Sequence, residues 1–268
     1  MKKALTLLLA ATLSGLASAV TYNWTELDLP TASATRVDKP NGTSNHTAPY
    51  LVQGLKGQDA GKVYVGGNQN EIGSNWGSND EGTWSATGNV GTATLAYRGG
   101  VQGDYAALVL GGMTADTNAD ILKYTFSVNK NTKSNDLSFS TAVGIVRNGN
   151  VLSTVDGVAT TDPTSALTSS FTVQANSALD NQTVELSLKT LFGDDFAWQS
   201  GDKLIVVFRG MSSTNNPTET YNVENISVSL GAIVPDSTPP GDGGTPEPTV
   251  LALLVVGVAG LALRRKQA

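Results

Sequence analysis

The segment LKYTFSV at residues 122–128 alternates apolar and polar side chains without a break. Its apolar side chains recur at every second position, as in a β-strand that buries one face and exposes the other to water. The same period of two appears in residues 137–145, 184–188 and 226–230. These four segments therefore predict β-strands rather than amphipathic helices.

The segment KLIVVFR at residues 203–209 is apolar throughout its middle, which is typical of a central strand covered on both faces. Asn148-Gly149 separates two apolar segments and predicts a two-residue hairpin turn, because both residues tolerate positive φ. Weaker strand candidates occupy residues 62–65, 92–97, 105–110, 151–155 and 166–173.

About ten short strands with regular polar turns predict an all-β fold, a single β-sandwich of the jelly-roll type, over residues 20–234. No window between the two termini has the pattern of an amphipathic helix. Residues 129–136 form a polar connector, and residues 68–89, rich in glycine and asparagine, are expected to form a long exposed loop.

The N-terminus has the three parts of a secretory signal peptide. Lys2 and Lys3 precede an apolar run that ends in Ala17-Ser18-Ala19. A basic region, a short apolar region and an A-x-A site together predict cleavage after Ala19 and export of the rest of the chain through the Sec machinery. We therefore assign residues 1–19 to a signal peptide and expect the mature chain to begin at Val20.

The C-terminus has a second group of linked features. Pro246-Glu247-Pro248 precedes an uncharged apolar run at residues 249–263, and Arg264, Arg265 and Lys266 follow it. As a helix these 15 residues would span roughly 22 Å, short of a hydrocarbon core of about 30 Å, so flanking residues or bilayer thinning must close the gap. The basic cluster predicts that this end of the transmembrane helix stays cytoplasmic.

This tail resembles the sorting tails of PEP-CTERM proteins of Gram-negative bacteria, since Pro-Glu-Pro, a short apolar helix and a terminal basic cluster occur in the same order. The resemblance covers residues 246–268, behind a linker rich in proline, glycine and aspartate at residues 235–245. It implies recognition and cleavage by a membrane enzyme, exosortase, and export linked to extracellular polysaccharide and biofilm matrix. The passenger domains of that family are diverse, so the resemblance implies how the protein is exported and processed, and not what its passenger domain does.

The amino-acid composition excludes several kinds of functional site and partner. The chain has no cysteine, which excludes disulfides, cysteine–metal sites and a cysteine nucleophile. Residues 20–246 carry 12 basic and 22 acidic residues, a net charge of −10. Such an acidic domain argues against nucleic acid and anionic polymers as partners, although it permits divalent cations.

Candidate catalytic groups are sparse. His46 is the only histidine and lies in a polar segment without a neighbouring acid. The adjacent carboxylates Asp80-Glu81 and Asp194-Asp195 do not supply the two facing acids of a glycosidase, because neighbours on a strand point to opposite faces. We therefore expect the protein not to be an enzyme.

The segment Asp116-Thr117-Asn118-Ala119-Asp120 has the acid spacing that opens a calcium loop. It departs from the EF-hand pattern, because Ile121 stands where glycine is needed and Ser127 where glutamate is needed. A structural Ca²⁺ on Asp116 and Asp120 is one hypothesis for this segment. The other is a polar turn that needs no ion and no cofactor.

Trp76 and Trp84 lie in the asparagine-rich segment 68–89. Aromatic faces beside amide and carboxylate groups suit stacking on and hydrogen bonding to a sugar. Alternatively, one or both tryptophans fold inward and anchor the segment. The sequence thus predicts an exported surface or matrix protein with a structural or adhesive role, or else a surface-displayed carbohydrate-binding module.

Overall fold

The computed structural model describes residues 21–37, 48–66, 82–98, 102–130, 137–152, 167–173, 178–212 and 219–234. The chain divides into two units, one of residues Asn23–Ala232 and one of the two chain ends, Met1–Tyr22 and Ile233–Ala268. Within the second unit, the Val234 amide donates a hydrogen bond of 2.9 Å to the Thr21 carbonyl oxygen.

Several predicted features lie outside the described residues. They are the signal peptide, the linker, the sorting tail with its transmembrane helix, His46, Trp76 and the Asp80-Glu81 pair. In the part of the chain that the structure describes, no helix has the length and apolarity needed to span a membrane.

The first sheet, sheet A, has the strand order β12-β8-β14-β5-β4, with β1 also paired to β14 and β6 to β5. Its strands are β12 (Leu179–Ser187), β8 (Ile121–Lys130), β14 (Glu219–Ile233), β5 (Val90–Arg98), β4 (Thr83–Thr87), β1 (Tyr22–Glu26) and β6 (Gln102–Gly103). The long strand β14 runs antiparallel between β8 on one edge and β5 on the other.

The second sheet, sheet B, has the order β10-β9-β13-β7-β3-β2, with β11 also paired to β9. Its strands are β10 (Asn150–Val151), β9 (Leu137–Arg147), β13 (Lys203–Ser212), β7 (Tyr105–Leu110), β3 (Lys62–Gly66), β2 (Thr35–Arg36) and β11 (Leu167–Val173). Its pairs are antiparallel except β2 with β3, which is parallel.

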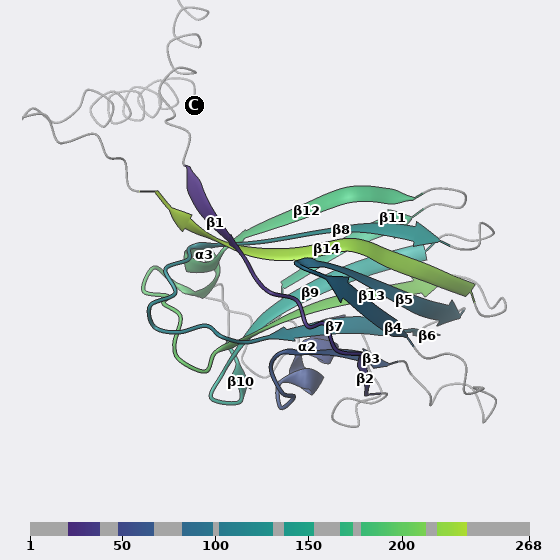
Figure 1. Ribbon diagram of the computed structural model, residues 1–268, viewed down its shortest axis with the longest axis horizontal. Helices are drawn as coiled ribbons and strands as arrows, with labels where there is room; N and C mark the ends of the chain where they lie inside the picture. Colours follow the sequence, from purple (N-terminus) through teal and green to yellow (C-terminus); the bar gives the residue numbers. More distant parts are fainter. Residues whose placement is uncertain are drawn as a thin grey trace, which may run out of the picture. The chain divides into compact units, whose positions relative to one another are not determined.

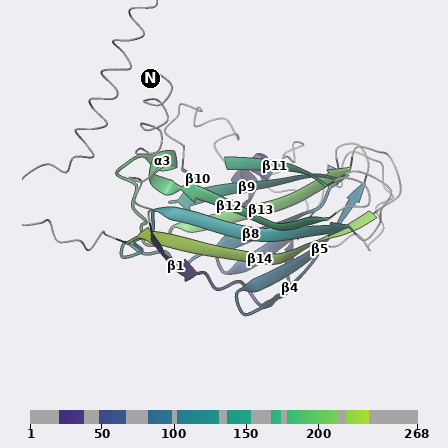
Figure 2. The same ribbon diagram turned by 90° about the horizontal axis from the view of Figure 1, so that it is seen from above.

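The two sheets form separate layers (Figures 1 and 2), and their inward side chains make one apolar core. Phe126 of sheet A lies 5.4 Å from Phe139 and 5.6 Å from Phe208 of sheet B, measured between ring centroids. The alternation at residues 122–128 is confirmed, because Leu122, Phe126 and their apolar neighbours face this core. The prediction of an all-β sandwich is therefore correct.

A second apolar layer covers the outer face of sheet B, where helix α2 (Ala48–Leu55) packs on β9 and β13 (Figure 1). Leu51, Val52 and Leu55 of α2 are buried against outward side chains such as Ile205 and Val207. This confirms that residues 203–209 form a central strand covered on both faces. It also corrects the expectation that the sandwich lacks amphipathic helices.

Other boundaries differ from the sequence prediction. Residue 188 begins helix α3 (Leu188–Phe192) instead of continuing a strand, because the Ser187 hydroxyl caps the helix by accepting from the Thr190 amide. The expected loop at 68–89 contains strand β4, and β8 extends to Lys130 into the predicted connector. The hairpin turn is confirmed, with φ of 51° at Asn148 and 78° at Gly149.

Candidate functional site

A loop between β7 and β8, residues 111–120, shapes the candidate site. Gly111 and Gly112 end β7 for different reasons. A Cβ at Gly111 would lie 2.7 Å from the Cβ of Ala60, so only glycine fits there. Gly112 has a φ of +87°, a conformation that L-residues rarely adopt, and a Cβ there would meet open space. The loop therefore leaves the sheet by a turn that needs both glycines.

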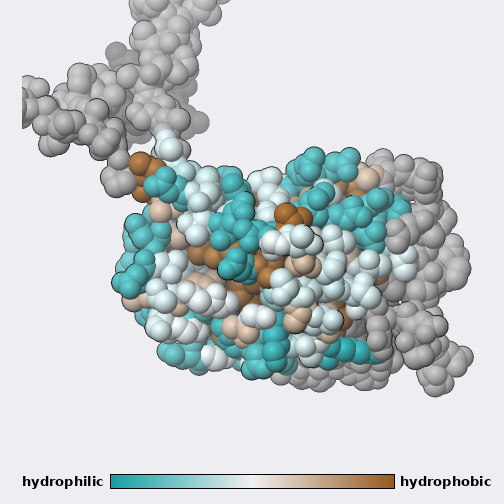
Figure 3. All heavy atoms as spheres, viewed as in Figure 1, coloured by the Kyte–Doolittle hydropathy of each residue, from teal (hydrophilic) through white to brown (hydrophobic). Residues whose placement is uncertain are grey.

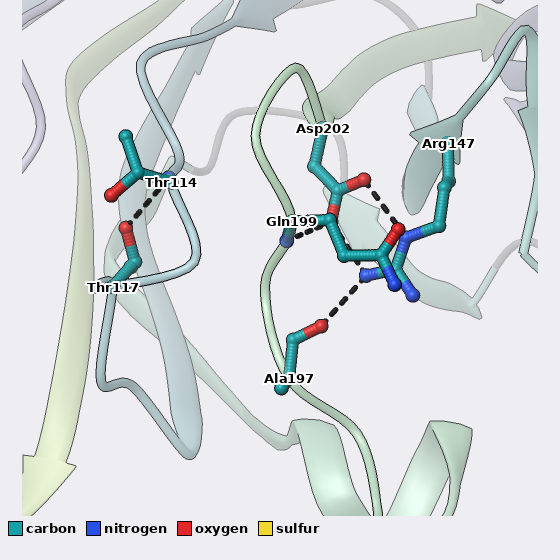
Figure 4. Close-up of polar contacts among 6 residues, drawn as sticks. All are labelled: Thr114, Thr117, Arg147, Ala197, Gln199 and Asp202. Atoms are coloured by element: carbon teal, nitrogen blue, oxygen red, sulfur yellow. Dashed lines mark hydrogen bonds and ion pairs between the residues drawn. The ribbon is translucent and has the colours of Figure 1, made fainter.

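The loop is held at its middle and at its end. Thr117 accepts a hydrogen bond of 3.0 Å from the Thr114 amide through its hydroxyl and returns one of 3.0 Å from its own amide to the Thr114 carbonyl (Figure 4). At the end of the loop, the Asp120 amide donates to the Gly231 carbonyl at 2.9 Å. The Asp120 carboxylate lies 2.7 Å from the Lys189 ammonium of α3. Sheet A and α3 therefore fix the base of the loop.

A pocket of about 340 Å³ lies between this loop, β1 and the end of β14. Apolar side chains of Leu27, Met113, Ala119 and Leu230 and polar side chains of Thr25, Asp116, Thr117 and Asn118 line it, together with Gly111, Gly112 and Ala232. Figure 3 shows apolar surface in a hollow near the segment that follows β1, with hydrophilic side chains around it. Asp116 is the only charged side chain among the described residues that line the pocket.

The two residues predicted as calcium ligands have different surroundings. Asp116 is exposed at the pocket, whereas Asp120 is largely buried and its carboxylate is paired with Lys189. The Lys189 ammonium at 2.7 Å from Asp120 would repel a cation there, so the ion pair disfavours calcium at this carboxylate. The described residues contain no group of three or more His, Asp or Glu side chains that could hold a metal ion.

Trp84 is a core residue, which favours inward anchoring over sugar stacking, the two alternatives that the sequence left open for it. Only 8% of it is exposed, and its indole N–H donates a hydrogen bond of 2.7 Å to the Pro30 carbonyl. Gly91 on β5 makes room for the ring, since a Cβ there would lie 2.1 Å from the Trp84 Cη2 atom. Trp84 thus has the anchoring role that the sequence left open for this segment.

An exposed tryptophan instead occurs on β1, in a segment whose sequence predicted no site. Trp24 is 36% exposed, and its ring lies against Gly231, whose Cβ would come within 2.8 Å of the Cζ3 atom. The Lys123 ammonium lies 3.6 Å from the centroid of the indole ring, within range of a cation–π contact. The contact between Trp24 and Gly231 joins two strands that are far apart in the sequence, so it could not be predicted from local sequence.

Asp194 and Asp195 are exposed in the turn after α3. The loop that follows is fixed by Arg147, which donates to Asp202 through Nε at 2.9 Å and through Nη2 at 2.6 Å, and to the Ala197 carbonyl at 2.7 Å (Figure 4). The hydrogen bonds that Arg147 donates to the Asp202 carboxylate raise the pKa of Arg147 above its ordinary value, despite partial burial. This cluster stabilises the loop.

Comparison with known proteins places a family motif on the tail. The model of the PEP-CTERM protein-sorting motif matches residues 245–266. The chain carries a PEP-CTERM sorting motif. The resemblance read from Pro246-Glu247-Pro248, the apolar run and the basic cluster is thereby confirmed. The motif supports an exported protein of the cell surface. No curated protein matches the chain.

Solved structures similar to this chain include sugar-binding domains. A candidate sugar-binding protein from Bacteroides thetaiotaomicron shows 10% identity and a TM-score of 0.38, over 77% of this chain and 100% of its own. A family 11 carbohydrate-binding module from Clostridium thermocellum shows 14% identity and a TM-score of 0.29, over 66% and 94%. A xylan-binding domain from Paenibacillus barcinonensis shows 10% identity and a TM-score of 0.26, over 64% and 83%.

Proposed function

We propose that this protein is a non-enzymatic component of the cell surface or extracellular matrix, with a jelly-roll β-sandwich as its passenger. The sorting motif at residues 245–266 is the observation that carries this proposal. The signal peptide directs the protein out of the cytoplasm through the Sec machinery, and residues 1–19 are removed in the process. An exosortase-like membrane enzyme then acts on the tail, which holds the protein in the membrane at least transiently through residues 249–263.

A structural or adhesive role of the passenger is supported by the outer face of sheet A. Small polar side chains there are paired across strands, as in Thr125 with Ser227 at 2.7 Å and Thr94 with Asn222 at 2.9 Å. Lys123 and the exposed Trp24 lie on the same sheet. A broad face rich in hydroxyl and amide groups offers many hydrogen-bonding groups to an adjoining extracellular polysaccharide or protein.

The alternative function is a surface-displayed carbohydrate-binding module. Trp84 no longer supports it, because its ring is buried in the core, and Trp76 lies outside the described residues. The observation that favours it is the pocket between β1, the β7–β8 loop and β14, which combines an apolar floor with hydroxyl, amide and carboxylate groups.

The proposal is tested by the intact mass of the protein from its native host, measured separately in membrane and matrix fractions. A matrix species that begins at Val20 and ends near Pro248 is the expected result. Glu247→Gln is expected to block that processing, whereas the control Glu185→Gln, an exposed glutamate of β12, leaves it unchanged. Retention of residues 249–268 in every fraction overturns the sorting step and leaves an ordinary membrane-anchored protein.

A further inference from the structure

We propose that the pocket beside the β7–β8 loop binds one residue of a neutral saccharide, with Asp116 and Asn118 as its main hydrogen-bonding side chains. This inference rests on the alternative function above, binding of carbohydrate, and gives it a site and a ligand class. The site differs from the one that the sequence placed on Trp76 and Trp84, of which Trp84 is buried and Trp76 lies outside the described residues.

The size and lining of the pocket suit a single ring. Its volume of about 340 Å³ lies at the lower end of the range for small-molecule sites, about 300–1,000 Å³. The floor of Leu27, Met113 and Leu230 offers apolar contact to the C–H face of a pyranose. The open space next to Gly112 lets a ligand approach the backbone without meeting a side chain.

The polar groups of the pocket suit hydroxyl groups. Asp116 presents two acceptor oxygens, and Asn118 presents both a donor and an acceptor, so the two together can pair with neighbouring sugar hydroxyls. Thr25 adds a hydroxyl from β1. A carboxylate with no basic side chain among the described lining residues disfavours uronates, sulfated sugars and phosphates by like-charge repulsion. The ligand is therefore neutral.

The loop is held in place before any ligand arrives. The Thr114–Thr117 hydrogen bonds close its turn, and Asp120 joins its end to Gly231 and Lys189. Asp116 lies within the Thr114–Thr117 turn, and Asn118 lies between that turn and Asp120. A loop that is already ordered loses less conformational entropy on binding, which favours affinity for a small ligand.

The test uses the full chain in a zwitterionic detergent whose head group is not a sugar. Glucose, galactose, mannose, N-acetylglucosamine and their β-linked disaccharides serve as neutral probes, with glucuronate as the anionic probe, in saturation-transfer NMR and calorimetric titration. We expect binding of at least one neutral probe and none of glucuronate. Asn118→Ala and Asp116→Asn should each weaken it by about tenfold, the loss of a hydrogen bond to a sugar hydroxyl.

Matched variants separate the pocket from the rest of the surface. Asn129→Ala and Asp180→Asn change exposed residues of β8 and β12 and should leave binding unchanged. Ala232→Leu fills the pocket and should abolish binding while the thermal midpoint stays that of the parent. The same thermal measurement on Asp116→Asn and Asn118→Ala shows that each variant is folded.

Each other result overturns the inference in a distinct way. Binding that survives all three pocket variants places the saccharide elsewhere on the protein and leaves the carbohydrate-binding function intact. Absence of binding to every neutral probe removes both the site and that function. Thermal stabilisation by CaCl₂ that is lost in Asp116→Asn, without saccharide binding, makes the pocket a cation site. None of these outcomes affects the sorting proposal, which the intact mass measures.

Discussion

At the scale of single residues, several glycines in the sheets are fixed by a neighbouring side chain rather than by backbone conformation. Gly91 is the strongest example, since the Trp84 ring occupies the place of its missing side chain. Gly144 similarly faces Val52 of α2, with a Cβ position 2.4 Å from the Val52 Cγ1 atom. Close packing of the two apolar layers therefore depends on glycine where a β-strand would otherwise favour a larger residue.

Gly91→Ala should destabilise the sandwich, because a methyl group at that position overlaps the Trp84 ring and forces it from its pocket. Overpacking of this kind costs roughly 1–3 kcal/mol of unfolding free energy, and an overlap this deep belongs at the upper end. Chemical denaturation monitored by tryptophan fluorescence gives the value. Gly57→Ala is the control, since a Cβ there meets nothing within 4 Å. An equal effect of both changes would contradict the packing argument.

Asp202→Ala should destabilise the loop before β13. The Asp202 side chain is 1% exposed and neutralises Arg147, so its loss leaves a partly buried guanidinium without its anion. The expected cost is roughly 3 kcal/mol, the lower end for breaking a buried ion pair, because Arg147 keeps some contact with water. Thermal unfolding provides the measurement.

The matched control is Lys62→Ala, which breaks an ion pair between Lys62 and Asp59 whose side chains are 48% and 74% exposed. Water and salt screen such a pair, so the unfolding midpoint should not change measurably. A comparable fall of the unfolding midpoint in both variants would show that burial of Asp202 does not make its ion pair more stabilising than an exposed one.

At the scale of elements, α2 is the main addition to the sandwich. Its eight residues bury Leu51, Val52 and Leu55 on the outer face of sheet B, so the sheet is apolar on both sides. The outer face of sheet A has no such cover within the described residues and carries hydroxyl and amide side chains. Over the described ranges, the outer face of sheet A is therefore polar and open to water, whereas α2 shields the outer face of sheet B.

Leu55→Ala in α2 should loosen one sheet and not the other. Truncation of a fully buried leucine costs about 2–5 kcal/mol, and here the cavity opens only above β9 and β13. Hydrogen exchange should therefore accelerate at amides of β13 more than at amides of β8, which serves as the internal control. Uniform acceleration of both strands would show that the helix and the sandwich unfold as one unit.

Strands with strict alternation were predictable from sequence, and the helix was not. Residues 122–128 and 203–209 were recognisable as strands from local sequence. Burial on one face gives alternation of apolar and polar side chains, and burial on both faces gives a continuous apolar run. In α2 the buried residues 51, 52 and 55 occupy little more than one turn, too short a stretch for a period of 3.6 to stand out. Trp84 was uncertain for another reason, because its partner Pro30 is 54 residues away.

The candidate pocket was only half predictable. Residues 116–120 stood out as a polar segment with acid spacing, although for calcium rather than a sugar. Thr25 and Leu230, which complete the pocket, carry no local signal and are brought to the loop by the pairing of β1 with β14. Asp120 could not be separated from Asp116 by sequence, because the Lys189 that neutralises it follows only after strands β8, β9, β10, β11 and β12 in the chain.

At the scale of the whole molecule, the sorting motif has to reach the membrane while the sandwich stays outside it. The eleven residues 235–245 separate the end of the described chain from Pro246 and can span at most about 40 Å when fully extended. Deletion of residues 236–243 shortens that reach to about 10 Å. We expect processing of the tail to fall, measured as the processed fraction by intact mass.

Replacement of residues 236–243 by glycine and serine of equal number is the control, and processing should then stay at the parental level. Normal processing of the shortened chain would show that the enzyme needs no clearance from the sandwich.

The strand that leads to the tail is β14, which is paired on both edges. Force applied to the tail of a tethered protein therefore acts first on this strand. A pull along its axis from the C-terminal end acts on the hydrogen bonds to β8 and to β5 in shear, so many bonds must fail together. An edge strand would oppose the same pull with hydrogen bonds on one side only. The connection to the tail therefore resists force at the point where the flow of surrounding water would apply it to an anchored passenger.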